Sequence, residues 1–386
     1  MSSAIMSTYK RLPVSFVRGK GCWVESSTGE QYLDALSGIA VCGLGHAHPR
    51  VATALADQST RLIHTSNLYG IPHQEALAEK LCALSGLEQV FFSNSGAEAN
   101  EAAIKLARRF GHTTGKSQPE IIVAENAFHG RTLAALAATG NVKAQEGFGP
   151  MPEGFVRVPY NDVAAVAAAG SEQTVAVFVE PIQGEGGIVV PDDGYLGGLR
   201  RLCDERDWLL MVDEVQSGMG RTGRWFAHQH ASIKPDVITL AKALANGVPI
   251  GACIAGGRAT DILGPGSHGS TFGGNPLSCA AGLAVCDVIA EENLTERAAV
   301  LGERLRAGFT KGLQGVEKVK EIRGRGLMIG IELTMPCAEL VTQALDAHLL
   351  INVTAGNVVR LLPPLILTDE EANQIVSTLV PLIKAL

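Results

Sequence analysis

Apolar runs and helical stretches alternate through the middle of the chain. The apolar runs are four to six residues long, and they lie at 89–93, 121–124, 175–180, 208–213, 237–240 and 250–255. Runs of this length are typical of buried strands, and the stretches between them have the spacing of helices. Strands that alternate with helices favour a mostly parallel sheet covered by helices, so the pattern predicts an α/β domain.

The two ends of the chain differ from this middle. The N-terminal residues have the pattern of short strands and turns, whereas the pattern after Gly282 predicts a long helix, two strands and a final helix. The strand candidates in these two zones are 21–25, 31–34, 327–333 and 358–362. Because either zone alone is too small to bury a good core, we expect the two to pack together.

The expected organisation therefore has three parts. They are an N-terminal segment (1–50), a large domain with the mostly parallel sheet (51–281) and a C-terminal small α+β domain (282–386). A chain of 386 residues is too long for one ordinary core, which supports the division.

Composition narrows the range of partners. Hydrophobic residues make up 46% of the chain and charged residues 18%, which is typical of a folded globular protein. The formal net charge of -7 gives no global attraction for nucleic acid or anionic lipid, so neither is expected as a partner. No apolar run is long enough to span a membrane, and the N-terminus lacks the apolar core of a signal peptide, so we expect a cytoplasmic protein.

The chain has 8 cysteines, and none of them forms a C-x-x-C pair. Most lie inside apolar runs. Structural zinc needs clustered thiolates, so we expect no metal site and interpret the cysteines as free thiols in a reducing cytosol.

Residues 91–101 have the pattern of a strand, a tight turn and a helix. Ser95 and Glu98 form the S-x-x-E pattern of a capping box, and Gly96 lets the backbone approach a ligand closely. The free N–H groups and the positive dipole end of such a helix suit a phosphate. An ordinary capped helix explains the same pattern, so the phosphate site depends on what lies beside it.

Asp213 stands at the end of the apolar run 208–213. In open α/β sheets, ligands gather at the carboxyl ends of the strands. A carboxylate there can pair with a protonated pyridine nitrogen, and Gln216 could donate a hydrogen bond to a ring oxygen. A strand-end Asp that caps the next helix is the alternative.

The run 237–240 leads almost directly into Lys242, which has apolar neighbours. Burial disfavours the ammonium form of a lysine and makes the amine a better nucleophile. A surface lysine with a solvated head is the alternative. The apolar neighbours and the turn at 247–251 argue against it.

Together these segments resemble the class III, or omega, aminotransferases, which are pyridoxal-phosphate enzymes of fold type I. The resemblance runs from about Leu12 to the C-terminus, and the signature stretch 178–251 holds both Asp213 and Lys242. The acetylornithine branch of the family looks closest, on the segments 38–41, 44–46, 64–69 and 184–187. Cys42 stands where the family often has Asn, at a position near the substrate.

The resemblance implies roles at the matching positions. Lys242 would be catalytic and would carry the cofactor as a Schiff base, and Asp213 would pair with its ring nitrogen. The other cofactor-binding residues would be Ser95, Gly96 and Ala97 at the phosphate, Phe128 on the ring face, Gln216 at the ring oxygen, and Thr271 at the phosphate of the other subunit. The role of Thr271 makes a homodimer with shared active sites part of the expectation.

The resemblance places the two substrate carboxylates on Arg131 and Arg360, with Ser270 as a further substrate-binding residue. The planar fork of Arg binds a carboxylate in bidentate fashion. Glu185, in a Gly-rich loop that could move with little strain, would neutralise Arg360 when no carboxylate is bound there. The alternative for Arg360 is an exposed arginine on an edge strand.

The predicted reaction transfers the δ-amino group of N-acetylornithine to 2-oxoglutarate, giving N-acetylglutamate semialdehyde and glutamate, in arginine biosynthesis. Succinylornithine, ornithine, 4-aminobutyrate and succinyldiaminopimelate stay open as donors. A cofactor-binding regulator without turnover is an interpretation from another class, but such a protein need not keep all of these residues. A nucleotide-binding dehydrogenase is excluded, because no G-x-G-x-x-G follows the first strand.

Overall fold

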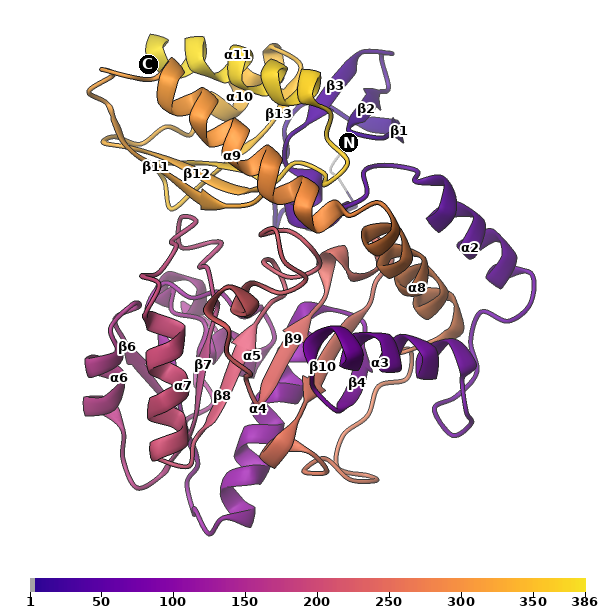
Figure 1. Cartoon of the computed structure of the whole chain (residues 1–386), viewed down its shortest axis with the longest axis vertical. Coiled ribbons are helices and arrows are strands. Elements are labelled where there is room, and N and C mark those ends of the chain that lie inside the picture. The colour runs from indigo at the N-terminus through magenta and orange to yellow at the C-terminus, as the bar shows by residue number, and fades with distance from the viewer. Residues whose placement is uncertain (1–3) are drawn as a thin grey trace.

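A seven-stranded sheet lies at the centre of the molecule, in the order β4-β10-β9-β8-β7-β5-β6 (Figure 1). The computed structural model describes residues 4–386. Strand β10 is antiparallel to both of its neighbours, and the other pairs of this sheet are parallel, as the sequence pattern predicts. The strands are β4 (Gln89–Ser93), β5 (Glu120–Ala124), β6 (Phe155–Val158), β7 (Thr174–Val179), β8 (Leu209–Asp213), β9 (Val237–Leu240) and β10 (Gly251–Ala255).

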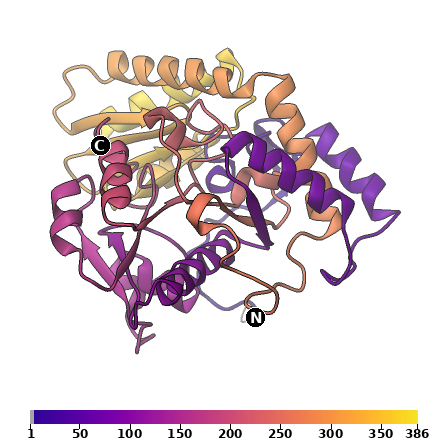
Figure 2. The same ribbon diagram turned by 60° about the horizontal axis from the view of Figure 1, so that its bottom comes forward.

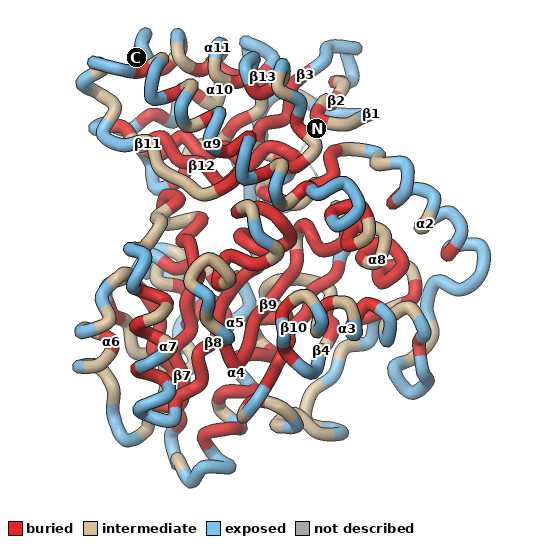
Figure 3. The backbone as a smooth tube through the Cα atoms, in the orientation of Figure 1, coloured by how far each residue is buried: buried red, intermediate tan, exposed pale blue. Residues whose placement is uncertain are grey.

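Helices cover both faces of this sheet. Along β8, Leu209 and Met211 belong to the apolar cluster that contains the core residues of α4 (Gly96–Thr113). Leu210 and Val212 point the other way, into the cluster that contains α7 (Tyr195–Glu205). Since side chains alternate along a strand, a strand covered on both sides is apolar throughout, and Figure 3 shows the central strands as buried.

Some of the remaining helices pack around the central sheet, and others lie at one end of it, where the two ends of the chain meet (Figure 1). They are α1 (Ser37–Ala40), α2 (Pro49–Ser59), α3 (Pro72–Ser85), α5 (Leu133–Ala138), α6 (Val163–Ala169), α8 (Pro276–Glu291), α9 (Leu294–Gly312), α10 (Leu340–Asp346) and α11 (Asp369–Ala385). No helix within residues 4–386 is both long enough and apolar enough to cross a membrane.

Two four-stranded sheets lie beyond that end of the central sheet (Figures 1 and 2). One has the order β1-β2-β3-β13 and the other β11-β12-β15-β14. Because β13 pairs in parallel with β3, N-terminal and C-terminal segments share a sheet. The strands are β1 (Phe16–Lys20), β2 (Trp23–Ser26), β3 (Gln31–Asp34), β11 (Val319–Arg325), β12 (Met328–Leu333), β13 (Leu349–Leu350), β14 (Asn352–Thr354) and β15 (Val358–Leu361).

The helix expected after Gly282 is wrong in its bounds. Helix α8 begins at Pro276, with the Asn275 side chain accepting from the Ser278 N–H, and it ends at Glu291. A second helix, α9, follows after Asn293, whose φ of 52° breaks the helical path. Gly282 lies inside α8, where a Cβ would come within 2.8 Å of Leu77, so this glycine marks close helix packing rather than a boundary.

Candidate active site

A cavity of about 370 Å³ opens at the carboxyl ends of the parallel strands. Its walls come from segments that follow β4, β5, β8 and β9, which lie far apart in the sequence. Eight of the predicted site residues line it: Ser95, Gly96, Ala97, Phe128, Arg131, Asp213, Gln216 and Lys242. The strand ends therefore bring together the residues that the sequence patterns singled out separately.

The first turn of α4 forms one end of the cavity. Ser95 caps the helix, since its hydroxyl accepts from the Glu98 N–H at 3.2 Å. The predicted capping box is only half formed: the Glu98 carboxylate accepts from the Asn94 N–H at 2.5 Å, because the extended backbone at Ser95 brings that N–H into reach. Within residues 4–386 the N–H groups of Gly96 and Ala97 meet no hydrogen-bond acceptor, and they form the positive end of the helix dipole.

Gly96 fits this turn for a steric reason. A Cβ at this position would lie 2.8 Å from Cγ1 of Val215, so a larger residue would push the helix start away from the strand β8 side. The helix start is thus a close-packed cradle suited to an anion.

Asp213 is buried in the cavity floor and accepts three hydrogen bonds. Its Oδ2 accepts from Asn100 Nδ2 at 2.8 Å and from His129 Nδ1 at 2.8 Å, and its Oδ1 accepts from the Val215 N–H at 3.0 Å. The bond to Val215 is the turn cap that was the alternative interpretation. The two side-chain donors go beyond a cap, since they fix the carboxylate in the cavity wall.

Asn100 and His129 are two of the site residues that sequence reasoning missed; Glu180, which also lines the cavity, is another. His129 is next to Phe128 and stacks on the Phe178 ring at 4.2 Å, and Asn100 also donates to the His129 carbonyl at 2.6 Å. Asn100 lies one helical turn after Gly96 on α4, which is the signal that could have pointed to it. Its contact with Asp213 spans 113 residues of sequence, and no local pattern reveals such a pairing.

Lys242 begins a short 3-10 helix, η3 (Lys242–Ala245), immediately beyond β9. Its φ is 44°, a left-handed backbone conformation that residues with a Cβ rarely adopt. Burial lowers the pKa of Lys242, and nearby Glu185 offsets part of that effect. Backbone strain of this kind is concentrated at functional sites. Lys242 is half-buried and lines the cavity, so the alternative of a surface lysine with a solvated head is wrong.

Glu185 and Arg360 form an ion pair beside the cavity. Arg360 lies on β15, an inner strand of its sheet, and is 0% exposed, so the exposed edge-strand alternative is wrong. Its Nε donates to Asn352 Oδ1 at 2.9 Å, and an Nη1 contact of 3.5 Å reaches Gln216 in the cavity wall. Burial raises the pKa of Glu185, but attraction and hydrogen bonding to Arg360, together with Lys242 and Gln216, outweigh this effect and leave that pKa low.

The loop that carries Glu185 is held more firmly than its glycines suggest. The Thr354 hydroxyl donates to the Glu185 carbonyl at 2.6 Å, and Gln183 pairs with Val189 as a β-bridge. The backbone at Glu185 is thus anchored, so a break of the ion pair with Arg360 requires a rotation of the Glu185 side chain rather than a movement of the loop.

The remaining predicted residues lie at the mouth of the site or outside it. The Arg131 guanidinium stands 5.5 Å from the centre of the Phe128 ring, as a cation–π contact at the cavity edge. Ser270 accepts from Asn94 Nδ2 at 3.2 Å and so touches the segment before α4, but it does not line the cavity. Thr271 is exposed and does not line the cavity of its own chain either.

The fold and this site define a class of protein, the pyridoxal-phosphate-dependent transferases. An ornithine aminotransferase from Toxoplasma gondii superposes with a TM-score of 0.96 at 37% identity, covering 99% of this chain and 93% of that one. An N-acetylornithine aminotransferase from Stenotrophomonas maltophilia gives a TM-score of 0.86 at 36% identity, covering 98% of each chain.

Comparison with protein families and with curated sequences shows which family within this class the chain belongs to. The family model of class-III aminotransferases matches residues 5–383, and the chain belongs to this family. It is 59% identical to acetylornithine aminotransferase 1 of Bordetella bronchiseptica, over 100% of this chain and 98% of that protein. It is 56% identical to acetylornithine aminotransferase of Nitrosomonas europaea, over 99% and 98%. The cofactor is pyridoxal phosphate, and the enzyme is an aminotransferase.

Proposed function

We propose that this enzyme transfers the δ-amino group of N-acetylornithine to 2-oxoglutarate, and that it serves arginine biosynthesis. The observation that carries the proposal is the Glu185–Arg360 pair beside the Lys242 cavity. A buried arginine with a removable partner suits an enzyme that must accept a substrate without a second carboxylate and then one with it. The names of the relatives at 56–59% identity support the same donor.

The residues that line the cavity fit pyridoxal phosphate. The open N–H groups at the start of α4 would hold its phosphate, Asp213 would pair with the ring nitrogen, and Phe128 would cover a ring face. Gln216 would donate to the ring oxygen, and Lys242 would bind the aldehyde carbon through Nζ. When bound, the cofactor supplies an electron sink for the substrate carbon that loses its proton.

Lys242 would also move protons during the reaction. Burial favours the neutral amine at Nζ, which can remove the proton from the substrate carbon that bears the amino group. Asp213, held by Asn100 and His129, would keep a negative charge fixed in the cavity.

Two arginines would orient the substrates. Arg131, at the cavity mouth, would bind the α-carboxylate of N-acetylornithine, while the Glu185 carboxylate stays on Arg360. For 2-oxoglutarate, Glu185 would turn away, and Arg360 would bind the second carboxylate with its fork. Ser270 would contribute to the substrate side through Asn94.

The active form would be a homodimer in the cytoplasm. Thr271 is exposed and lies outside the cavity of its own chain, which supports a role at the phosphate of a second subunit. We also keep the division into an N-terminal segment, a large domain and a small domain. The run of helix α8 supports moving the last boundary from 282 to beyond Glu291.

The test is a panel of amine donors with 2-oxoglutarate, in which glutamate is measured. N-acetylornithine should give the highest kcat/KM, above ornithine, succinylornithine, 4-aminobutyrate and succinyldiaminopimelate. A higher value for ornithine, the donor in the name of the Toxoplasma relative, would reassign the donor but keep the reaction. No glutamate with any donor would favour a cofactor-binding regulator.

A further inference from the structure

Glu180, the residue after β7, is in contact with two walls of the active site at once. It is 5% exposed. Its Oε2 accepts from the Phe128 N–H at 2.9 Å, and its Oε1 accepts from the Gly184 N–H at 3.1 Å. The two oxygens of one carboxylate therefore join the loop after β5 to the loop that carries Glu185.

The hydrogen bond from the Phe128 N–H to Glu180 restrains the part of the cavity wall that the Phe128 ring forms. Phe128 lines the cavity, and Arg131 lies over its ring. Phe128 lies outside any helix or strand, so no regular backbone pairing fixes its position. The bond from its N–H to Glu180 is therefore a specific restraint on the position of the ring. The restraint connects segments that are 52 residues apart in the sequence.

The hydrogen bond from the Gly184 N–H to Glu180 restrains the loop from which Glu185 reaches Arg360. Gly184 packs so closely on Gln216 that a Cβ would lie 2.4 Å from Gln216 Oε1. Its N–H is held by Glu180 on one side, and the carbonyl of Glu185 is held by Thr354 on the other. The position from which the Glu185 side chain reaches Arg360 is thus set at two points, and Glu180 supplies one of them.

We propose that Glu180 is a positioning residue that sets the donor preference of the enzyme by holding the backbone of the Glu185 loop. The inference rests on the proposed function, because it concerns the same choice between a terminal amine and an α-amino acid. Without this restraint, Glu185 covers Arg360 less completely. Amino acids with a second carboxylate, such as glutamate, then compete better as donors.

A carboxylate is required at this position because it accepts at both oxygens. The amide of Gln has one acceptor, and its NH2 group would face an N–H donor. Burial raises the pKa of Glu180 to about 7, with His129 lowering it and Asp213 raising it. The charge on Lys242 also faces Glu180. The two-point contact is complete above this pH and loses one acceptor below it.

The experiment is a double-mutant cycle on donor preference, measured as the ratio of kcat/KM for glutamate to that for N-acetylornithine. Glu180→Gln should raise this ratio roughly tenfold, the loss expected for one charge-assisted hydrogen bond. In a Glu185→Ala background, the same substitution should change the ratio less than about twofold, since the residue through which it acts is absent. The ratio should also depend on pH around 7 in the parent and lose that dependence in Glu180→Gln.

Glu214→Gln is the matched control. Glu214 is also buried, and its carboxylate accepts from the N–H groups of Ala227 and His228 at 2.9 and 2.8 Å, away from the Glu185 loop. It should lower thermal stability without changing the donor ratio. If Glu180→Gln does not fold, Glu180→Asp, whose shorter carboxylate cannot span both N–H groups, should shift the ratio in the same direction.

An unchanged ratio in the folded Glu180 variant, or an equal shift with and without Glu185, overturns the inference. Failure of the proposed function has a separate signature, because the parent enzyme would then give no glutamate from N-acetylornithine. In that case the cycle is run with whichever terminal amine the parent accepts.

Discussion

Substitution of either member of the Glu185–Arg360 pair should affect the two half-reactions differently. Arg360→Ala removes the guanidinium that would bind the second carboxylate of 2-oxoglutarate. Without a bound carboxylate, Arg360 makes a charge-assisted bond to Glu185 and donates to Asn352 at 2.9 Å. With 2-oxoglutarate bound, the substrate carboxylate would take the place of Glu185. A lost contact to a charged group costs about 1.5–3 kcal/mol, which is roughly a ten- to hundredfold loss in 2-oxoglutarate affinity.

Glu185→Ala should have another effect. It leaves Arg360 buried and charged, with only the neutral side chains of Asn352 and Gln216 to accept from it among residues 4–386, and breaking a buried pair costs about 3–5 kcal/mol. The Glu185 side chain is 33% exposed, so solvent screening reduces this figure to about 1–3 kcal/mol. The guanidinium, no longer paired with Glu185, should then bind the second carboxylate of glutamate, which becomes a better donor relative to N-acetylornithine.

The assay is single-turnover kinetics of each half-reaction in both variants, with cofactor absorbance as the signal. Arg297→Ala is the control, since Arg297 pairs with Asp369 at 2.7 Å outside the site and should leave both rates unchanged. Equal losses in both half-reactions for Arg360→Ala, with no change of donor preference in Glu185→Ala, would refute the reasoning and leave a structural salt bridge.

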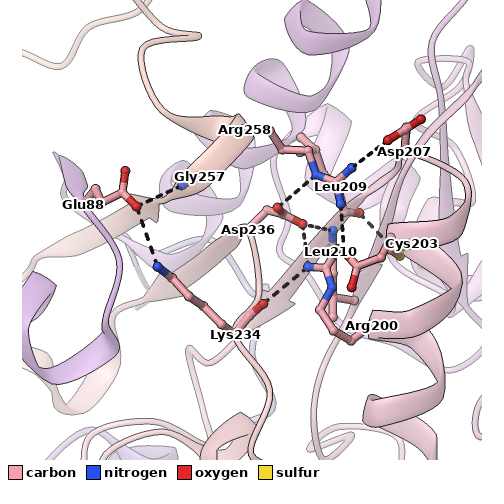
Figure 4. A network of polar contacts seen from close by, with 11 residues as sticks. Glu88, Arg200, Cys203, Asp207, Leu209, Leu210, Lys234, Asp236, Gly257 and Arg258 are labelled. Carbon is pink, nitrogen blue, oxygen red and sulfur yellow. Dashed lines mark hydrogen bonds and ion pairs between the residues drawn. The ribbon is translucent and has the colours of Figure 1, made fainter.

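Three further substitutions have defined outcomes. Asp213→Asn keeps the shape but removes the charge, so cofactor binding should survive while the donor half-reaction slows by orders of magnitude; near-normal turnover would reduce Asp213 to a turn cap. Asp236→Ala should lower stability by about 3 kcal/mol, because it leaves the Leu210 N–H without its acceptor at 2.8 Å and removes one of the two carboxylates that pair with Arg200, the one at Nη1 (Figure 4). Turnover per folded molecule should stay unchanged, and a parallel loss of activity would contradict a purely structural role. Burial lowers the pKa of Lys242, so between that lowered value and 10.5 the unfolded chain binds a proton that the folded chain does not. The stability of the cofactor-free protein should therefore rise with pH across this window, and Lys242→Met should remove that component from denaturation curves.

The sequence predicts the central sheet well because its strands are covered on both faces. Continuous apolar runs such as 237–240 follow directly from that burial. Strand β6 was not predicted, since it is an edge strand with Arg157 in its middle and most of its residues are only half buried. The break between α8 and α9 depends on the left-handed backbone of Asn293, which hydrophobic spacing does not show.

The site residues that could be predicted are those marked by a local feature of the sequence, and those that could not depend on long-range contacts. Asp213 and Lys242 could be predicted because their positions at strand ends are local features of the sequence. The residues that hold Asp213 in place, Asn100 and His129, could not, since those contacts span 113 and 84 residues. The Glu98 carboxylate accepts from the Asn94 N–H instead of the Ser95 N–H, because the backbone at Ser95 is extended. The S-x-x-E pattern does not contain this information.

The most direct test of the account is to find which residue holds the cofactor. The purified enzyme should be yellow, and borohydride reduction followed by peptide mapping should place the pyridoxyl mass on the peptide that contains Lys242. Lys242→Ala should abolish both this label and turnover, while the variant still binds free cofactor without covalent attachment. A label on a different lysine, or a Lys242→Ala protein that still turns over, would contradict the account.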